Sequence, residues 1–208
     1  MIKTGSEFLD EFLKGYRNEV HCIYGEGATG KTTICIQVSA NLAKLGKKVL
    51  YIDTENGFST ERFKQIAGPK YLDLLDNIFI LKVKDFRDQY YKVKNLVELS
   101  NFDFLIIDTV GFYYRKEVKL DKYKSNNMLK HHFDHLYKIS KKGVPVIVAN
   151  QVYARIDSTV PAPVGGNIIV PNCDVLIRLE KDPRKIILMK PYEDFKYFKI
   201  DDSGIISS

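Results

Sequence analysis

The sequence predicts an α/β fold in which a mainly parallel central sheet is flanked by helices and extended by antiparallel C-terminal strands. Two observations support this prediction. As far as about residue 150, short runs rich in Val, Ile and Leu alternate with amphipathic helical segments, a pattern typical of parallel strands buried on both faces. After residue 174, three strand-like segments follow one another with short turns and no helix between them, which favours antiparallel pairing at one edge of the sheet.

Each expected element follows from its local pattern. Ser6 is placed to cap an amphipathic helix over residues 6–14, which Gly15 closes. The helix expected at residues 32–45 has an apolar face made of Ile34, Val38, Leu42 and Leu45. Further helices are expected at residues 59–67, 85–99 and 121–141, and strands at residues 21–24, 48–53, 78–83, 104–108, 144–150, 175–180, 185–190 and 195–200.

The length and composition of the chain restrict its class. Its 208 residues, 45% of them hydrophobic, suffice for one domain with a core of its own. No apolar run approaches the length of a membrane span, and the N-terminal stretch lacks a signal peptide's hydrophobic region, so we expect a soluble, cytoplasmic protein. Cys22, Cys35 and Cys173 form no C-x-x-C pair and are expected to be buried free thiols. The net charge of +6 permits a polyanionic partner without requiring one.

The most specific motif is a glycine-rich loop between a strand and a helix. Residues 25–33 read GEGATGKTT and match the phosphate-binding pattern G-x-x-x-x-G-K-S/T at every defined position. In such a loop the backbone N–H groups surround a phosphate, and the start of the helix adds a partial positive charge. The loop predicts a nucleoside triphosphate site in which Lys31 reaches the β and γ phosphates and the Thr32 hydroxyl ligates Mg²⁺. The predicted binding residues are Gly25, Glu26, Gly27, Ala28, Thr29, Gly30, Lys31, Thr32 and Thr33.

Three polar side chains at strand ends are candidates to complete this site. Asp108 ends an apolar strand, at the carboxyl edge where ligands bind in open α/β sheets, and is expected to hold the magnesium shell; a turn aspartate is the alternative. Glu55 follows the strand at 48–53 and is the candidate general base for the attacking water, unless it is an exposed loop residue. Gln151 follows the strand at 144–150 and is either a hydrogen-bond donor to the γ-phosphate or a simple turn residue.

At these positions the chain resembles the RecA-type recombinase family, in its archaeal and eukaryotic branch. The resemblance rests on GEGATGKTT, then YIDTEN and STERF within residues 51–63, FLIIDT at 104–109, ANQV at 149–152 and PVGGNII at 163–169. It extends from about Thr4 to the C-terminus and implies a RecA-like core that uses ATP and Mg²⁺. The roles it implies are Lys31 and Thr32 on phosphate and metal, Asp108 as the Walker B metal residue, Glu55 as catalytic base and Gln151 as γ-phosphate sensor.

Within that family the chain most resembles RadB, the short archaeal paralogue of the recombinase RadA. Full-length recombinases carry an N-terminal helix-hairpin-helix domain and a Phe-x-x-Ala polymerisation motif; here we expect a single ATPase core domain over residues 1–208. The resemblance implies DNA binding, weak ATP hydrolysis and no strand exchange of its own. It also implies a RadA-type recombinase and a junction-processing nuclease as partners in recombination and repair, and it leaves homo-oligomer formation open.

Two segments correspond to the DNA-binding loops of that family, at residues 111–116 and 153–166. In the first, Tyr113 and Tyr114 are expected to stack on bases, while Arg115 and Lys116 neutralise phosphates of single-stranded or branched DNA. Core aromatics beside a solvated basic pair are the alternative. Tyr153 and Arg155 are weaker candidates in the second segment.

Two other patterns are interpreted as structural. His131 and His135 have the i, i+4 spacing of a metal pair, but no carboxylate or cysteine is obviously placed to complete a site, so a surface or interface helix face is expected. The alternating aromatic stretch at residues 192–198 is interpreted as an edge strand or a subunit contact.

Two hypotheses about function therefore remain from the sequence. The first is an ATP-binding and DNA-binding accessory protein of homologous recombination with weak ATPase activity. The second is a regulatory protein of the RecA-like superfamily that is switched by ATP and acts through protein partners without engaging DNA.

Overall fold

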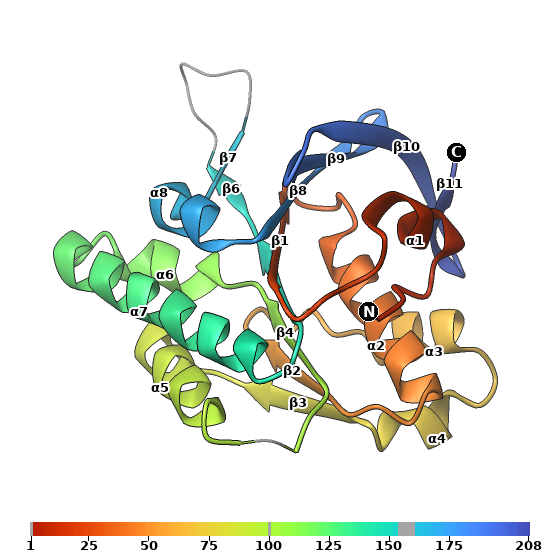
Figure 1. The fold of residues 1–208 in the computed structure, drawn as a ribbon, viewed down its shortest axis with the longest axis horizontal. Helices are drawn as coiled ribbons and strands as arrows, with labels where there is room; N and C mark the ends of the chain where they lie inside the picture. Colours follow the sequence, from red (N-terminus) through yellow and green to blue (C-terminus); the bar gives the residue numbers. More distant parts are fainter. Residues whose placement is uncertain (1, 100, 154–160) are drawn as a thin grey trace.

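A nine-stranded sheet forms the centre of the molecule. The structure is a computed structural model that describes residues 2–99, 101–153 and 161–208 (Figure 1). The strand order is β11-β10-β9-β8-β1-β5-β4-β2-β3. The bounds are β1 (Val20–Gly25), β2 (Val49–Asp53), β3 (Ile78–Lys82), β4 (Phe104–Asp108), β5 (Val146–Asn150), β8 (Val175–Lys181), β9 (Arg184–Lys190), β10 (Asp194–Asp201) and β11 (Gly204–Ser207).

The predicted fold class is confirmed, with one refinement at the C-terminal end. Strands β8, β1, β5, β4, β2 and β3 are parallel, whereas β9, β10 and β11 add to the edge in antiparallel fashion. The short turns had indicated that the strand at 175–180 would already be an antiparallel addition. In the structure this strand, β8, is parallel to β1, and the first antiparallel strand is β9. The terminal strand β11 was not predicted. Every residue of β4 and β5 is buried, as their uniformly apolar runs require.

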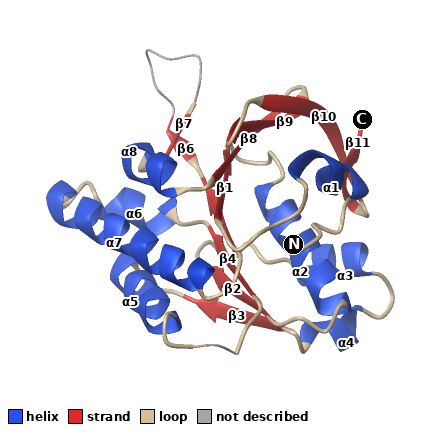
Figure 2. Ribbon diagram, in the orientation of Figure 1, coloured by secondary structure: helices blue, strands red, loops and turns tan. Residues whose placement is uncertain are grey.

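Helices cover both faces of the sheet (Figures 1 and 2). One face carries α1 (Glu7–Leu13), α2 (Lys31–Lys44), α3 (Thr60–Ala67) and α4 (Tyr71–Leu75), and the other α5 (Phe86–Leu96), α6 (Gly111–Glu117), α7 (Lys122–Lys141) and α8 (Gly166–Ile169). A short ribbon of β6 (Val152–Tyr153) and β7 (Ala162–Pro163) lies beside α8, which continues into the 3₁₀ turn η1 (Val170–Asn172). None of the helices in the described residues is long and apolar enough to cross a bilayer.

The N-terminal helix is tied to the last strand. The predicted cap is present, because Ser6 Oγ accepts a hydrogen bond from the Leu9 N–H (3.3 Å). The same hydroxyl donates to the Ile205 carbonyl (2.6 Å), so one side chain both starts α1 and binds β11. At the end of α2 the prediction for Leu45 was wrong: the helix stops at Lys44, and Leu45 is 64% exposed.

The expected DNA-binding loop at residues 111–116 is instead the helix α6. The helix is amphipathic, and its Tyr114 packs edge-on against Phe86 of α5, with the ring centroids 5.5 Å apart. Its C-terminal turn closes through a hydrogen bond from the Val118 N–H to the Tyr114 carbonyl (2.9 Å). Burial of Tyr114 against α5 and α7 therefore outweighed the loop character that the aromatic and basic residues suggested. The three cysteines are free and buried, as predicted.

Candidate functional site

A cavity of about 710 Å³ lies at the carboxyl ends of the parallel strands. From the glycine-rich loop it is lined by Gly25, Glu26, Gly27, Ala28, Lys31 and Thr32. Glu55, Asp108 and Gln151, each at the end of a different strand, line it as well. Because β1, β2, β4 and β5 run parallel, their carboxyl ends meet at one edge, and the residues predicted from separate segments come together there.

The glycine-rich loop holds Lys31 at the cavity. Gly30, at the start of α2, has φ +107°, a conformation that strains any other residue, and a Cβ there would lie 2.9 Å from Ile200 Cδ1. The Lys31 Nζ donates to the carbonyls of Gly25 (2.9 Å) and Glu26 (2.6 Å). Burial lowers the pKa of Lys31, and the nearby carboxylate of Asp108 counteracts part of that effect.

Asp108 and Thr32 form a pair of oxygen donors. The Thr32 hydroxyl donates to Asp108 Oδ2 (2.8 Å), and the Tyr51 hydroxyl donates to the same oxygen (2.7 Å). Burial raises the pKa of Asp108, whereas these two hydrogen bonds lower it. A hydroxyl and a carboxylate side by side suit Mg²⁺, which prefers oxygen ligands. Tyr51 was missed from the sequence, although a tyrosine within a buried apolar strand signals a hydroxyl that needs a partner.

Glu55 and Gln151 are joined across the cavity. Gln151 Nε2 donates to both carboxylate oxygens of Glu55 (2.7 and 2.8 Å), and the Thr109 hydroxyl donates to Glu55 Oε1 (2.7 Å). The turn that carries Glu55 is fixed by Asp53, whose carboxylate accepts the N–H groups of Gly57 (3.0 Å) and Phe58 (3.1 Å). Neither Thr109 nor Asp53 was recognised from the sequence, because their roles depend on contacts between separate segments.

The comparisons with known proteins identify the family. A family model described as Rad51 matches residues 1–206. The chain belongs to the RadB branch of the Rad51 family. A protein of Methanoculleus marisnigri named DNA repair and recombination protein RadB is 34% identical over 199 residues, which are 91% of this chain and 88% of that protein. The protein of the same name from Thermococcus gammatolerans is 34% identical and covers 99% of this chain and 98% of its own length. The crystal structure of a RadB recombinase superposes with a TM-score of 0.77 at 29% identity and full coverage of both chains.

In this family member the end of β5 is connected to the segment PVGGNII. Asn150 Nδ2 donates to the Val164 carbonyl (2.8 Å), while Asn150 Oδ1 accepts the Gln151 N–H (2.9 Å). The Val164 N–H in turn donates to the Gln151 carbonyl (2.9 Å). Gln151 is therefore held on the cavity side by Glu55 and on the other side by residues near α8.

Replacing Gly111 with alanine is expected to destabilise this connection. A Cβ at Gly111 would lie 2.4 Å from Asn150 Oδ1 and 3.0 Å from Val164 Cγ1, so Asn150 would lose its hydrogen bonds or α6 would shift. We expect the free energy of unfolding to fall by about 1–3 kcal/mol, measured by urea denaturation. Gly27→Ala is the matched control, since a Cβ there meets nothing within 4 Å. Equal effects of the two substitutions would contradict the prediction.

The structure corrects part of the predicted DNA-binding set. Tyr114 is 4% exposed and its hydroxyl donates to Asn126 Oδ1 (2.7 Å), so its ring is not available to stack on a base. Tyr113 is half-buried, and its hydroxyl donates to the Val83 carbonyl (2.9 Å). Lys116 is exposed, whereas Arg115 and Tyr153 line the cavity. Arg155 lies outside the described residues.

The histidines of α7 do not form a metal site with neighbouring ligands. No group of three or more His, Cys, Asp and Glu side chains that suits a metal ion occurs in the part of the chain that the structure describes. His131 is exposed and pairs with Asp134 (3.1 Å). His132 is fully buried, and His135 packs against the ring of Tyr90, with the centroids 5.6 Å apart.

Proposed function

We propose that this chain binds Mg-ATP in the cavity, hydrolyses it slowly, and binds DNA as an accessory protein of homologous recombination and repair without strand exchange of its own. The observation that carries this proposal is the convergence of Lys31, Thr32, Asp108, Glu55 and Gln151 around one cavity. The names of the RadB relatives give the biological setting.

In this proposal the glycine-rich loop and the start of α2 bind the phosphates. Backbone N–H groups of the loop and the Lys31 ammonium contact the phosphate oxygens, replacing some of the carbonyl contacts that Lys31 makes. Thr32 and Asp108 supply the oxygen donors for Mg²⁺. The metal, when bound, neutralises part of the negative charge on the phosphates.

Glu55 is the general base of the proposed hydrolysis. Its carboxylate orients the attacking water and accepts its proton, while the Thr109 hydroxyl fixes its position. Gln151 contacts Glu55 and, through Val164, the segment near α8. Gln151 is thus placed to transmit the nucleotide state to the second DNA-binding segment.

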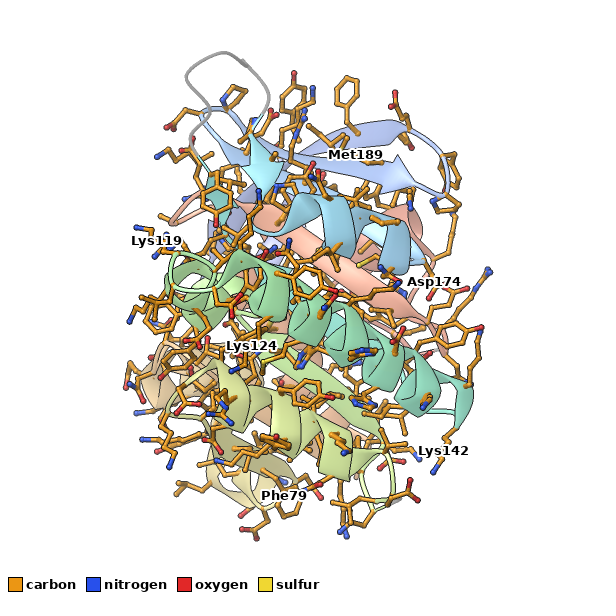
Figure 3. All side chains as sticks on the ribbon, turned by 90° about the vertical axis from the view of Figure 1, so that its left-hand side faces the viewer. Phe79, Lys119, Lys124, Lys142, Asp174 and Met189 are labelled. Atoms are coloured by element: carbon orange, nitrogen blue, oxygen red, sulfur yellow. The ribbon has the colours of Figure 1, made fainter. Side chains whose placement is uncertain are left out.

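DNA contacts the exposed surface that runs from the end of α6 to the start of α7 rather than the rings of Tyr113 and Tyr114. We call Lys116, Lys119, Lys122, Tyr123 and Lys124 the α6–α7 surface; all five are exposed, and Tyr123 is 80% exposed. Residues 115–124 hold five cationic and two acidic side chains. Figure 3 views the molecule from this side, with Lys119 and Lys124 labelled. Exposed lysines beside an aromatic ring suit single-stranded DNA, which binds by charge neutralisation and base stacking.

Removing three lysines from this surface tests the DNA proposal. We expect Lys116→Ala/Lys119→Ala/Lys122→Ala to weaken single-stranded DNA binding. The slope of the logarithm of the binding constant against the logarithm of the salt concentration should become smaller in magnitude by about 2. Fluorescence anisotropy over a range of salt concentrations measures both. The control removes three exposed lysines from the other side of the sheet, Lys44, Lys64 and Lys70. Equal losses in the two variants, or a salt-independent affinity, would refute this surface as the DNA site.

Lys31→Ala tests the nucleotide site. Loss of a buried ammonium that contacts phosphate is expected to weaken Mg-ATP binding about thirtyfold, measured by isothermal titration calorimetry. Unchanged affinity would contradict the proposed site.

The burial of Tyr114 supports one alternative function. With its ring packed in the core, the stacking argument for residues 111–116 is weaker, and an ATP-switched regulator that binds protein partners fits the same cavity. Such a regulator would bind Mg-ATP normally and show no specific binding to single-stranded or branched DNA.

In both cases we propose a RadA-type recombinase and a junction nuclease as partners, and we propose self-association as a third kind of assembly. Sedimentation with and without ATP and single-stranded DNA distinguishes these assemblies.

A further inference from the structure

The two adjacent cations of α6 have different surroundings. Arg115 is half-buried and lines the cavity together with Lys31, Glu55 and Gln151. Lys116 is exposed, and its Nζ lies over the ring of Phe112, 4.5 Å from the centroid. From the sequence, both residues were expected to contact DNA phosphates, but in the structure only Arg115 lines the cavity.

The charges around the cavity favour a nucleotide role for Arg115. Of the described residues that line it, Lys31 and Arg115 are cationic, and Glu26, Glu55 and Asp108 are acidic. Glu26 lies at the rim and pairs with Lys181 (3.2 Å), but Glu55 and Asp108 face the same space that a triphosphate would enter. Even with Mg²⁺ at Thr32 and Asp108 as proposed, the metal and Lys31 carry less positive charge than the two carboxylates and a triphosphate carry negative charge, and Arg115 supplies a further positive charge.

Arg115 is grouped with the residues that we propose to face the terminal phosphate, Glu55 and Gln151. It is carried by α6, which starts just after Asp108 and Thr109, and Thr109 holds Glu55. Tyr153 also lines the cavity, and although burial raises the pKa of its phenol, the Arg115 guanidinium opposes that shift, as expected for neighbouring groups. Arg115 thus neighbours Tyr153, which follows Gln151 by two residues, and Gln151 is hydrogen-bonded to Glu55.

We propose that Arg115 contacts the terminal phosphate of bound ATP and so distinguishes ATP from ADP, rather than contacting DNA. This inference rests on the proposed nucleotide function and assigns a specificity residue within the same site. A guanidinium suits the task, because its planar fork can bind two phosphate oxygens at once and its charge does not depend on pH. Since α6 leads directly into the α6–α7 surface, the contact also connects the terminal phosphate to the proposed DNA site.

Nucleotide affinities of Arg115→Ala test the inference. By calorimetry with Mg²⁺ we expect the variant to bind the non-hydrolysable ATP analogue AMP-PNP at least about tenfold more weakly, with ADP affinity changed less than about twofold. Arg115→Lys keeps the charge but not the fork and should fall between wild type and Arg115→Ala. Arg87→Ala is the matched control: it removes an exposed arginine of α5 outside the cavity and should leave both affinities unchanged.

The outcomes separate this inference from the proposed function. If Arg115→Ala loses affinity equally for AMP-PNP and ADP, or for neither, the proposed role of Arg115 is wrong. The nucleotide site itself is still supported in that case if the wild-type protein binds nucleotide and Lys31→Ala does not. If, without nucleotide, Arg115→Ala loses as much DNA affinity as Lys116→Ala does, Arg115 contacts DNA and the inference is also wrong. If the wild-type protein binds neither nucleotide, the proposed function itself fails. Urea denaturation of each variant shows whether a lost affinity reflects unfolding.

Discussion

Replacing Glu55 with glutamine is expected to lower the rate of ATP hydrolysis about a hundredfold or more, while Mg-ATP affinity changes less than about threefold. The amide has nearly the same size and can still accept a hydrogen bond from the Thr109 hydroxyl, but it cannot accept a proton from water. In the proposed site, binding depends on the glycine-rich loop, Lys31 and the Thr32–Asp108 pair, which the substitution leaves in place. Single-turnover assays with protein in excess measure the rate even if turnover is slow.

Glu61→Gln is the control for that experiment. Glu61 is an exposed carboxylate in the first turn of α3 and does not line the cavity, so its variant should hydrolyse ATP at the wild-type rate. If Glu55→Gln also hydrolyses at the wild-type rate, Glu55 is not the base. If the variant loses hydrolysis but keeps ATP-dependent DNA binding, ATP acts as a switch and its turnover serves to reset it.

The sequence was sufficient for the parallel sheet and for much of the site because both depend on local patterns. Apolar runs locate the strands, and residues at the ends of parallel strands must share an edge, so Asp108, Glu55 and Gln151 could be placed near Lys31 without coordinates. Their roles remain predictions, but the structure shows that all of them line one cavity with Lys31.

Other features depend on packing between distant segments and could not be read from the sequence. Tyr51 reaches Asp108 from a neighbouring strand, and β11 pairs with β10 from a short segment with little pattern of its own. In α6, three aromatic residues followed by two basic ones are equally consistent with a DNA-binding loop and with an amphipathic helix. The helix forms because α5 and α7 provide an apolar surface for Tyr114, and its geometry then turns Arg115 toward the cavity.

Acid is expected to destabilise the protein strongly, through two buried histidines. Burial lowers the pKa of His132 to about 3 and that of His21 to about 4, from an ordinary value of 6.5. Both are neutral in the native state at pH 5, whereas histidines of the unfolded chain are protonated. Stability present above pH 6.5 is therefore lost as the pH falls, by about 2 kcal/mol per histidine at pH 5. A loss of about 4 kcal/mol is a large part of the total stability of a typical domain, about 5–15 kcal/mol. Urea denaturation near pH 7 and near pH 5 measures it.

The two histidines differ in a way that makes the effect separable. Neither ring nitrogen of His132 has a hydrogen-bond partner within the described part of the chain, and the neighbouring His135 also disfavours its protonation. His21 instead lies 3.3 Å from the Val146 carbonyl, and hydrogen bonds with the backbone of Val146 and Glu19, together with the charge of Asp174, favour its charged form and reduce its contribution. His132→Phe should therefore remove about half of the acid sensitivity, because a ring of similar shape fills the same space without titrating. If the difference in stability between pH 7 and pH 5 is the same in wild type and His132→Phe, the buried imidazole is not the cause.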